Sequence, residues 1–222
     1  MKLRSSILII AAVIIIDQVL KIWIKTNYPL GPVTNILGLP WAKLYFIENE
    51  GMAWGWKLGG EWGKMMLTLF RLAAVIFGSW YLGRIVKQNY SRGFIICASL
   101  IYAGALGNLI DSLFYGLIFE ESTYSHIAAI FPAHGYGSFL HGKVVDMLYF
   151  PMIHSTFPTW IPFIGGNEFE FFSPIFNIAD ASISVGVIAL LLFQKRLLKK
   201  DHMEESHTVT TSTEISDQPQ VM

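Results

Sequence analysis

The sequence is poor in cysteine and in charge, and both shortages restrict what the protein can be. Its one cysteine, Cys97, excludes an internal disulfide and a structural zinc site built from thiolates. Only 14% of the 222 residues are charged, and the formal net charge of zero provides no basic field for nucleic acid. With 53% hydrophobic residues, the composition is instead typical of an integral membrane protein.

Apolar runs long enough to cross a bilayer occur four times in the chain. They cover residues 7–24, 65–86, 94–118 and 175–198. The first run forms about 27 Å of helix, which is close to the thickness of a hydrocarbon core. A cleaved signal peptide is the alternative for this run, but a signal core is shorter and no small-residue cleavage site follows. The sequence therefore predicts a mainly α membrane protein with four transmembrane helices.

Basic residues beside these runs predict how the protein is oriented. Most of them lie in short segments on one side of the predicted spans: Lys2, Arg4, Arg84, Lys87, Arg92, Lys195, Arg196, Lys199 and Lys200. Because Lys and Arg concentrate on the cytoplasmic side of membranes, we expect both termini in the cytoplasm. Residues 1–198 then form one membrane domain with external lobes at 25–64 and 119–174. Residues 199–222 form a polar tail that we expect to be disordered.

The external segment 25–64 has the composition of a small β-rich lobe. It contains prolines, glycines and an alternating stretch around residues 43–47, which predicts strands. Within it, Asn49 and Gly51 belong to a compact stretch, for which an ordinary hairpin turn is the alternative interpretation. Four tryptophans of this segment suit the membrane interface: Trp41, Trp54, Trp56 and Trp62.

Aspartates in or beside the apolar runs indicate function, because an ionisable side chain is costly in a membrane. Asp180 lies in the fourth run, and Asp146 precedes that run in Val144-Val145-Asp146. If the two meet in a poorly solvated site, they hold one proton between them. The ionised member can then draw a proton from water while the other protonates a scissile carbonyl oxygen. This is the chemistry of an aspartyl hydrolase, and it requires no metal and no cofactor.

Further polar residues are expected at the same depth. Asp17 and Lys21 are four residues apart in the first run, so they share a helix face and can pair. Gly104, Asn108 and Asp111 share a face of the third run, where the glycine allows a close approach of another helix.

Four histidines and one arginine are interpreted as non-catalytic. His126, His134, His141 and His154 lie in the second external segment, but their spacing is not that of metal ligands. Arg71, in the second run, is predicted to snorkel to the headgroups.

The motifs taken together resemble lipoprotein signal peptidase, also called signal peptidase II, over about residues 5–198. In chain order they are Asp17-Gln18-x-x-Lys21, Asn49-x-Gly51, Gly104-x-x-Gly107-Asn108-x-x-Asp111, Val144-Val145-Asp146 and Phe176-Asn177-x-Ala179-Asp180. The resemblance implies an intramembrane aspartyl endopeptidase of the bacterial inner membrane with its active site near the periplasmic face. It would remove signal peptides from prolipoproteins by cutting before a diacylglyceryl-modified cysteine.

Site residues and partners also follow from the resemblance. Asp146 and Asp180 would be the catalytic pair. Supporting or substrate-binding positions would be Asp17, Lys21, Asn49, Gly51, Gly104, Asn108, Asp111, Asn177 and Ala179. The partners would be diacylglyceryl-prolipoproteins, membrane lipids and cyclic-peptide inhibitors such as globomycin. We expect a monomer.

The sequence departs from the family pattern in three places. The family usually has a Gly-Gly pair where this chain has Ala103-Gly104. It usually has an arginine where this chain has Ser112, so any salt bridge made by that arginine must be absent or replaced. The segment between Ser112 and Asp146 is also longer than in the family.

A small proton- or ion-coupled transporter is the alternative function, with Asp17, Asp111, Asp146 and Asp180 as a relay. Only four spans, no sign of inverted repeats and acids gathered at the outer end argue against it. A membrane scaffold whose acids only pair with basic side chains is a third possibility, although buried ion pairs are poor sources of stability.

Overall fold

A computed structural model describes residues 3–50, 60–151, 153–171 and 174–197. Its long helices are α1 (Leu3–Asn27), α2 (Gly60–Lys87), α3 (Arg92–Ile118) and α4 (Ile178–Leu197). All four are long and apolar enough to cross a membrane, which confirms the predicted fold class. Gly51, Trp54, Trp56 and the tail at 199–222 lie outside the described residues.

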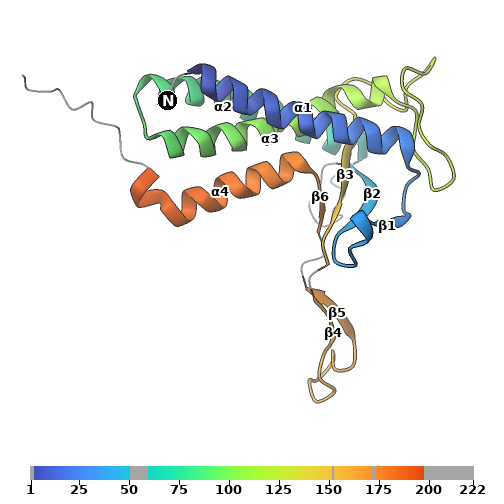
Figure 1. Ribbon diagram of the computed structural model, residues 1–222. Helices are drawn as coiled ribbons and strands as arrows, with labels where there is room; N and C mark the ends of the chain where they lie inside the picture. Colours follow the sequence, from blue (N-terminus) through green and yellow to red (C-terminus); the bar gives the residue numbers. More distant parts are fainter. Residues whose placement is uncertain (1–2, 51–59, 152, 172–173, 198–222) are drawn as a thin grey trace, which may run out of the picture.

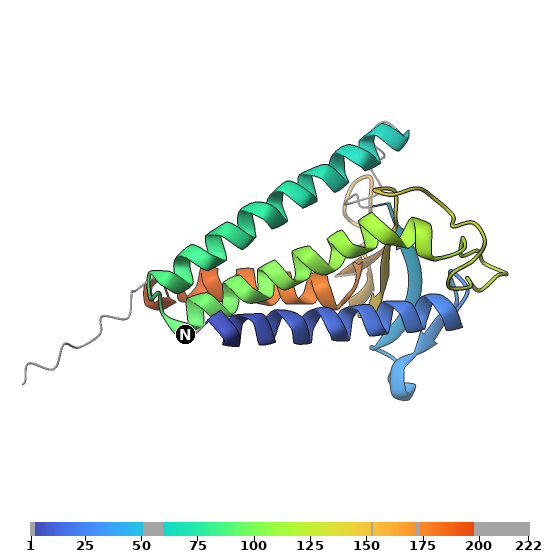
Figure 2. The same cartoon turned by 90° about the horizontal axis from the view of Figure 1, so that it is seen from above.

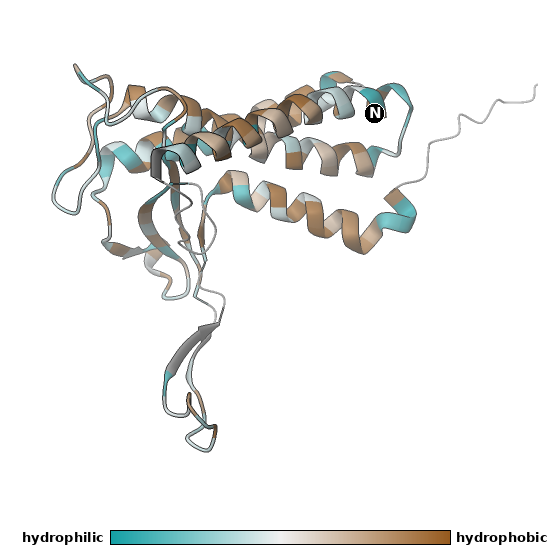
Figure 3. Ribbon diagram, turned by 180° about the vertical axis from the view of Figure 1, so that it is seen from behind, coloured by the Kyte–Doolittle hydropathy of each residue, from teal (hydrophilic) through white to brown (hydrophobic). Residues whose placement is uncertain are grey.

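The four helices lie alongside one another, and α3 contacts each of the other three (Figure 1). Figure 2 shows that α2 diverges from α3 toward the beginning of α2. Apolar residues cover the middle of the helices, as Figure 3 shows, and many of these residues are exposed on the outside of the bundle. An exposed apolar surface of this kind suits a bundle surrounded by lipid.

An antiparallel sheet closes the end of the bundle at which α1 ends (Figure 1). Its strands, in spatial order, are β1 (Val33–Asn35), β2 (Lys43–Asn49), β3 (Val144–Tyr149) and β6 (Ile175–Phe176). The strand predicted around residues 43–47 is therefore confirmed. The fourth predicted span begins at Ile178 rather than at Ile175, because Ile175 and Phe176 pair with β3.

A compact core joins this sheet to α1 and α3. It consists of Ile24, Phe46, Tyr115, Phe119, Val145 and Met147, all of them buried. Beside this core, the ammonium of Lys25 binds the carboxylate of Glu48 and donates to Ser122 Oγ at 2.8 Å. The core and this ion pair hold β3 against the helices, so that Asp146 lies at the junction between sheet and bundle.

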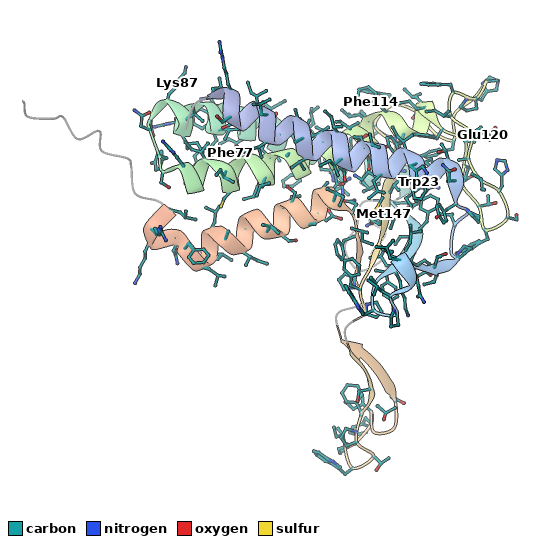
Figure 4. All side chains as sticks on the ribbon, viewed as in Figure 1. Trp23, Phe77, Lys87, Phe114, Glu120 and Met147 are labelled. Carbon is teal, nitrogen blue, oxygen red and sulfur yellow. The ribbon has the colours of Figure 1, made fainter. Side chains whose placement is uncertain are left out.

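A second pair of strands, β4 (Ile153–Thr156) and β5 (Glu168–Phe171), forms a hairpin that extends away from the helices (Figure 1). Figure 4 shows that the side chains at its tip lie far from the rest of the molecule. Trp160 and Phe163 lie in the loop between these strands and are strongly exposed. The external segment at 119–174 thus contains β3 and this hairpin in addition to loops.

Candidate active site

The polar residues that the motifs single out gather where α1, α3, α4 and β3 meet. Asp146 lies on β3 and is 2% exposed, and Asp180 lies in the first turn of α4. The short strand β6 pairs with β3 and leads into α4 through Asn177. This connection brings the two aspartates to one place, although 33 residues separate them in the chain.

Asn177 links the two carboxyl groups. Its Nδ2 donates to Asp146 Oδ1 at 2.7 Å, and its backbone N–H donates to Asp180 Oδ2 at 3.4 Å. Its Oδ1 accepts a hydrogen bond from the backbone N–H of Asp180 at 2.8 Å, as in a capping box at a helix N-terminus. The residue that begins α4 therefore also sets the position of one aspartate relative to the other.

Asn108 on α3 and Asn49 on β2 add one donor to each aspartate. Asn108 Nδ2 donates to Asp180 Oδ1 at 2.7 Å, and Asn49 Nδ2 donates to Asp146 Oδ2 at 3.2 Å. The Oδ1 atom of Asn108 accepts from Lys21 at 2.9 Å and from Asn177 at 3.1 Å. Because these two donors hold the oxygen, the amide nitrogen of Asn108 must face Asp180.

A buried ion network lies beside the pair. Lys21 Nζ is 2.9 Å from Asp17 Oδ2 and 2.8 Å from Asp111 Oδ2, so the predicted Asp17–Lys21 pair forms. The other Asp17 oxygen accepts the backbone N–H of Ala179 at 2.9 Å. Gln18 donates to Asp111 Oδ1 at 2.8 Å. The network therefore ties α1 and α3 to the beginning of α4.

The pKa of Asp146 is raised to about 7, mainly because burial disfavours its ionised form. The negative charge of Asp180 raises it further, while hydrogen bonds from Asn49 and Asn177 oppose the increase. A carboxyl group in this condition can hold a proton near neutral pH and release it during a reaction.

Arg71 does not reach toward the headgroups, so the snorkelling prediction was wrong. Its Nη1 donates to Ser112 Oγ on α3 at 2.7 Å. Its guanidinium also interacts electrostatically with Asp111, Asp180 and Asp146. A buried hydroxyl and several acids inside the bundle are better partners than lipid for this cation.

Two residues that contact the site are not among the predicted site residues. Gln18 stands in the first motif without an assigned role, and Arg71 was predicted to snorkel to the headgroups. A polar side chain inside an apolar run was the available signal for both. Which way each side chain points, however, depends on how the helices are rotated against α3.

The histidines of the second external segment show no metal-binding arrangement in the described part of the chain. There, no three His, Cys, Asp or Glu side chains are placed to hold a metal ion. His126 pairs with Glu120 at 3.1 Å, and His141 contacts Ser138 at 2.9 Å.

Comparison with known proteins finds similarity over nearly the whole chain, including the residues of the site. The family model for signal peptidase (SPase) II matches residues 9–195. Lipoprotein signal peptidase of Porphyromonas gingivalis is 47% identical over 190 residues, covering 85% of this chain and 81% of that protein. The protein of the same name from Amoebophilus asiaticus is 32% identical over 204 residues, covering 91% of this chain and 82% of that protein. A bacterial membrane enzyme solved by the in meso method at 1.9 Å resolution superposes with a TM-score of 0.57 at 27% identity, covering 87% of this chain and 94% of that one.

Proposed function

This chain belongs to the signal peptidase II family, and from that premise we propose that Asp146 and Asp180 act as an aspartic catalytic pair. The chain is a multi-pass bacterial membrane protein that removes signal peptides from prolipoproteins. The observation that carries the proposal is the Asn177 bridge, which holds two carboxyl groups together at a buried junction.

The two aspartates differ in their surroundings, and the roles we propose for them are based on this difference. Burial raises the pKa of Asp146 to about 7, which favours its protonated form relative to an ordinary carboxyl group, so we propose it as the acid. Asp180 accepts N–H donors from Asn108 and Asn177 and lies at the N-terminus of α4, where a negative charge is favoured. Asp180 is therefore the base, and Asp146 is the acid.

The reaction proceeds through two proton exchanges. Asp180 takes a proton from a water molecule, the water oxygen bonds to the scissile carbonyl carbon, and Asp146 gives its proton to the carbonyl oxygen. In the resulting diol, Asp146 takes a proton back from one hydroxyl group while Asp180 protonates the amide nitrogen. The C–N bond then breaks, and both carboxyl groups return to their initial states. No covalent intermediate with the protein forms.

The substrate we propose is a diacylglyceryl-modified prolipoprotein, cut before its lipid-modified cysteine. The site lies at the end of the bundle next to the sheet, where acyl chains can stay in the bilayer while the peptide reaches the aspartates (Figure 1). Asn108 and Asn177 already bind carboxyl groups, so we assign them to positioning the pair rather than to holding substrate backbone. Because the chain resembles the family, we expect globomycin to inhibit its cleavage activity.

Carboxylate-to-amide variants test the pair. We expect wild-type protein to cleave a diacylglyceryl-modified prolipoprotein in detergent with a chelator present, as followed by a gel shift. Asp146→Asn and Asp180→Asn should each reduce the rate by about 10³-fold or more, because each removes one proton-transfer group. Glu121→Gln, which changes an exposed carboxylate, is the matched control.

Two outcomes would contradict the proposal. If either variant cleaves at the wild-type rate while remaining folded by size exclusion and thermal unfolding, the pair is assigned wrongly and Asp111 becomes the next candidate. If wild-type protein never cleaves, and reconstituted protein carries a proton flux that the same variants abolish, the transporter alternative takes its place.

A further inference from the structure

Arg71 is joined to the aspartic pair by a chain of hydrogen bonds. Its Nη1 donates to Ser112 Oγ at 2.7 Å, and Ser112, which is 1% exposed, donates in turn to the backbone carbonyl of Asn108 at 2.9 Å. Asn108 Nδ2 then donates to Asp180 Oδ1 at 2.7 Å. The guanidinium is therefore coupled to the helical turn that holds the proposed base.

The charges around the pair show why a second cation matters. Lys21 on α1 is already engaged by Asp17 and Asp111, at 2.9 Å and 2.8 Å. Arg71 enters from α2 and interacts electrostatically with Asp111 and with both members of the pair. A guanidinium keeps its charge in apolar surroundings, so it supplies a permanent positive field at this place.

The position of Ser112 suits this contact. Ser112 is buried on α3, and its hydroxyl both accepts a hydrogen bond from Arg71 of α2 and donates one to the backbone of Asn108, one helical turn away. A serine cannot carry the charge, but its Oγ can fix the direction of the neighbouring guanidinium.

We propose that Arg71, bound to Ser112, is a positioning residue of the aspartic pair. The proposal rests on the assignment of Asp146 and Asp180 as the catalytic pair. Arg71 orients the turn bearing Asn108, and its charge favours the ionised member of the pair. Among the described residues, the charged groups beside the pair are Asp17 and Lys21 on α1, Arg71 on α2 and Asp111 on α3, with the neutral Asn49 on β2.

The positive charge of Arg71 should set where the pair titrates. A nearby positive charge favours ionised carboxyl groups, so removing it makes both proton dissociations of the pair occur at higher pH. The lower limb of the pH–rate profile reports ionisation of the base, and the upper limb reports loss of the proton from the acid. Both limbs should therefore move upward when the charge of Arg71 is removed.

The test measures kcat/KM for a diacylglyceryl-modified prolipoprotein between pH 5 and 9 in detergent. For Arg71→Met we expect a loss of about tenfold or more at the optimum, because the pair is both misplaced and less ionised. Both limbs should shift upward by about half a pH unit or more. Arg71→Lys, which keeps the charge, should leave the limbs near their wild-type positions. Arg84→Met, which removes an exposed arginine of the same helix, is the matched control.

Returning a positive charge from α3 tests whether the charge itself sets the limbs. The double variant Arg71→Met/Ser112→Arg should bring both limbs back toward their wild-type positions. Ser112→Ala removes the acceptor but keeps the arginine, so it should give a smaller loss and a smaller shift, and it serves if Arg71→Met does not fold.

Several results would overturn the proposal. A uniform loss at every pH with unmoved limbs would show that Arg71 only packs against α3, and full activity of Arg71→Met and Ser112→Ala would show that neither positions the pair. Failure of the double variant to move the limbs back would show that a positive charge at this place does not set them. These outcomes differ from failure of the aspartic pair, which the two Asp→Asn variants report separately.

Discussion

Asn177 shows how one side chain combines a structural and a chemical role. A carboxamide has both a donor and an acceptor, and Asn177 uses the acceptor to cap α4 and the donor to hold Asp146. An aspartate at this position would retain the cap but lose the donor, and it would add a negative charge beside the pair. The bridge between the two aspartates therefore depends on the amide.

Burial of Asp146 also predicts how stability depends on pH. Its folded-state pKa of about 7 lies above the ordinary value of 3.8, so the folded state binds the proton more tightly than the unfolded state. This contribution is fully present below pH 3.8 and is lost as the pH rises through 7, at a cost of about 4 kcal/mol. Asp146→Asn cannot ionise, so its Tm in detergent should fall less between pH 5 and pH 8 than that of the wild type.

The comparison uses thermal unfolding of both proteins at the two pH values. Glu121→Gln controls for the loss of an exposed carboxylate. If the Tm of the wild type and that of Asp146→Asn fell equally, the pKa of Asp146 would not be raised by burial in the folded state.

At the scale of the helices, the site depends on how closely α3 and α4 approach. A Cβ atom on Gly104 would lie 2.2 Å from the backbone oxygen of Ala179, so this position permits the contact only as glycine. The same contact places Asn108 within hydrogen-bond distance of Asp180. The glycine is therefore a requirement of the site and not only of the packing.

We predict that Gly104→Ala reduces cleavage by about 10²-fold and lowers the Tm, because the helices must separate and misplace Asn108 by a fraction of an ångström or more. Gly83→Ala on α2 is the matched control, since nothing lies within 4 Å of its added Cβ. In a helix the control should be neutral or slightly stabilising. Wild-type rates for Gly104→Ala would show that the contact can relax without moving the pair.

For the whole molecule, the distribution of basic residues predicts that the sheet and the site face away from the cytoplasm. The loop between α2 and α3 lies at one end of the bundle, and the segment that follows α3 lies at the other (Figure 1). In a Cys97→Ser background, a cysteine at the exposed Ser125 should react with a membrane-impermeant maleimide in intact cells.

A cysteine at the exposed Gln88, in the α2–α3 loop, should react only after the cytoplasmic membrane is opened. Both substitutions replace a small or uncharged polar residue, which makes their labelling comparable. Labelling in the reverse order would place the termini and the site on the sides opposite to those predicted.

The sequence by itself determined the four spans, the strand near residues 43–47 and the list of candidate site residues. It could do so because hydrophobic runs, the residues beside them and the motifs inside them are local properties of the chain. It also identified the Asp17–Lys21 pair, because residues four apart on a helix must share a face.

Only the tertiary structure decided how these parts meet. Pairing with β3 moved the beginning of α4 to Ile178, and packing against α3 turned Arg71 toward Ser112 instead of the headgroups. The Asn177 bridge likewise requires a strand and a helix from distant parts of the chain. Contacts between distant segments depend on the rotation and depth of whole elements, and no local pattern specifies those.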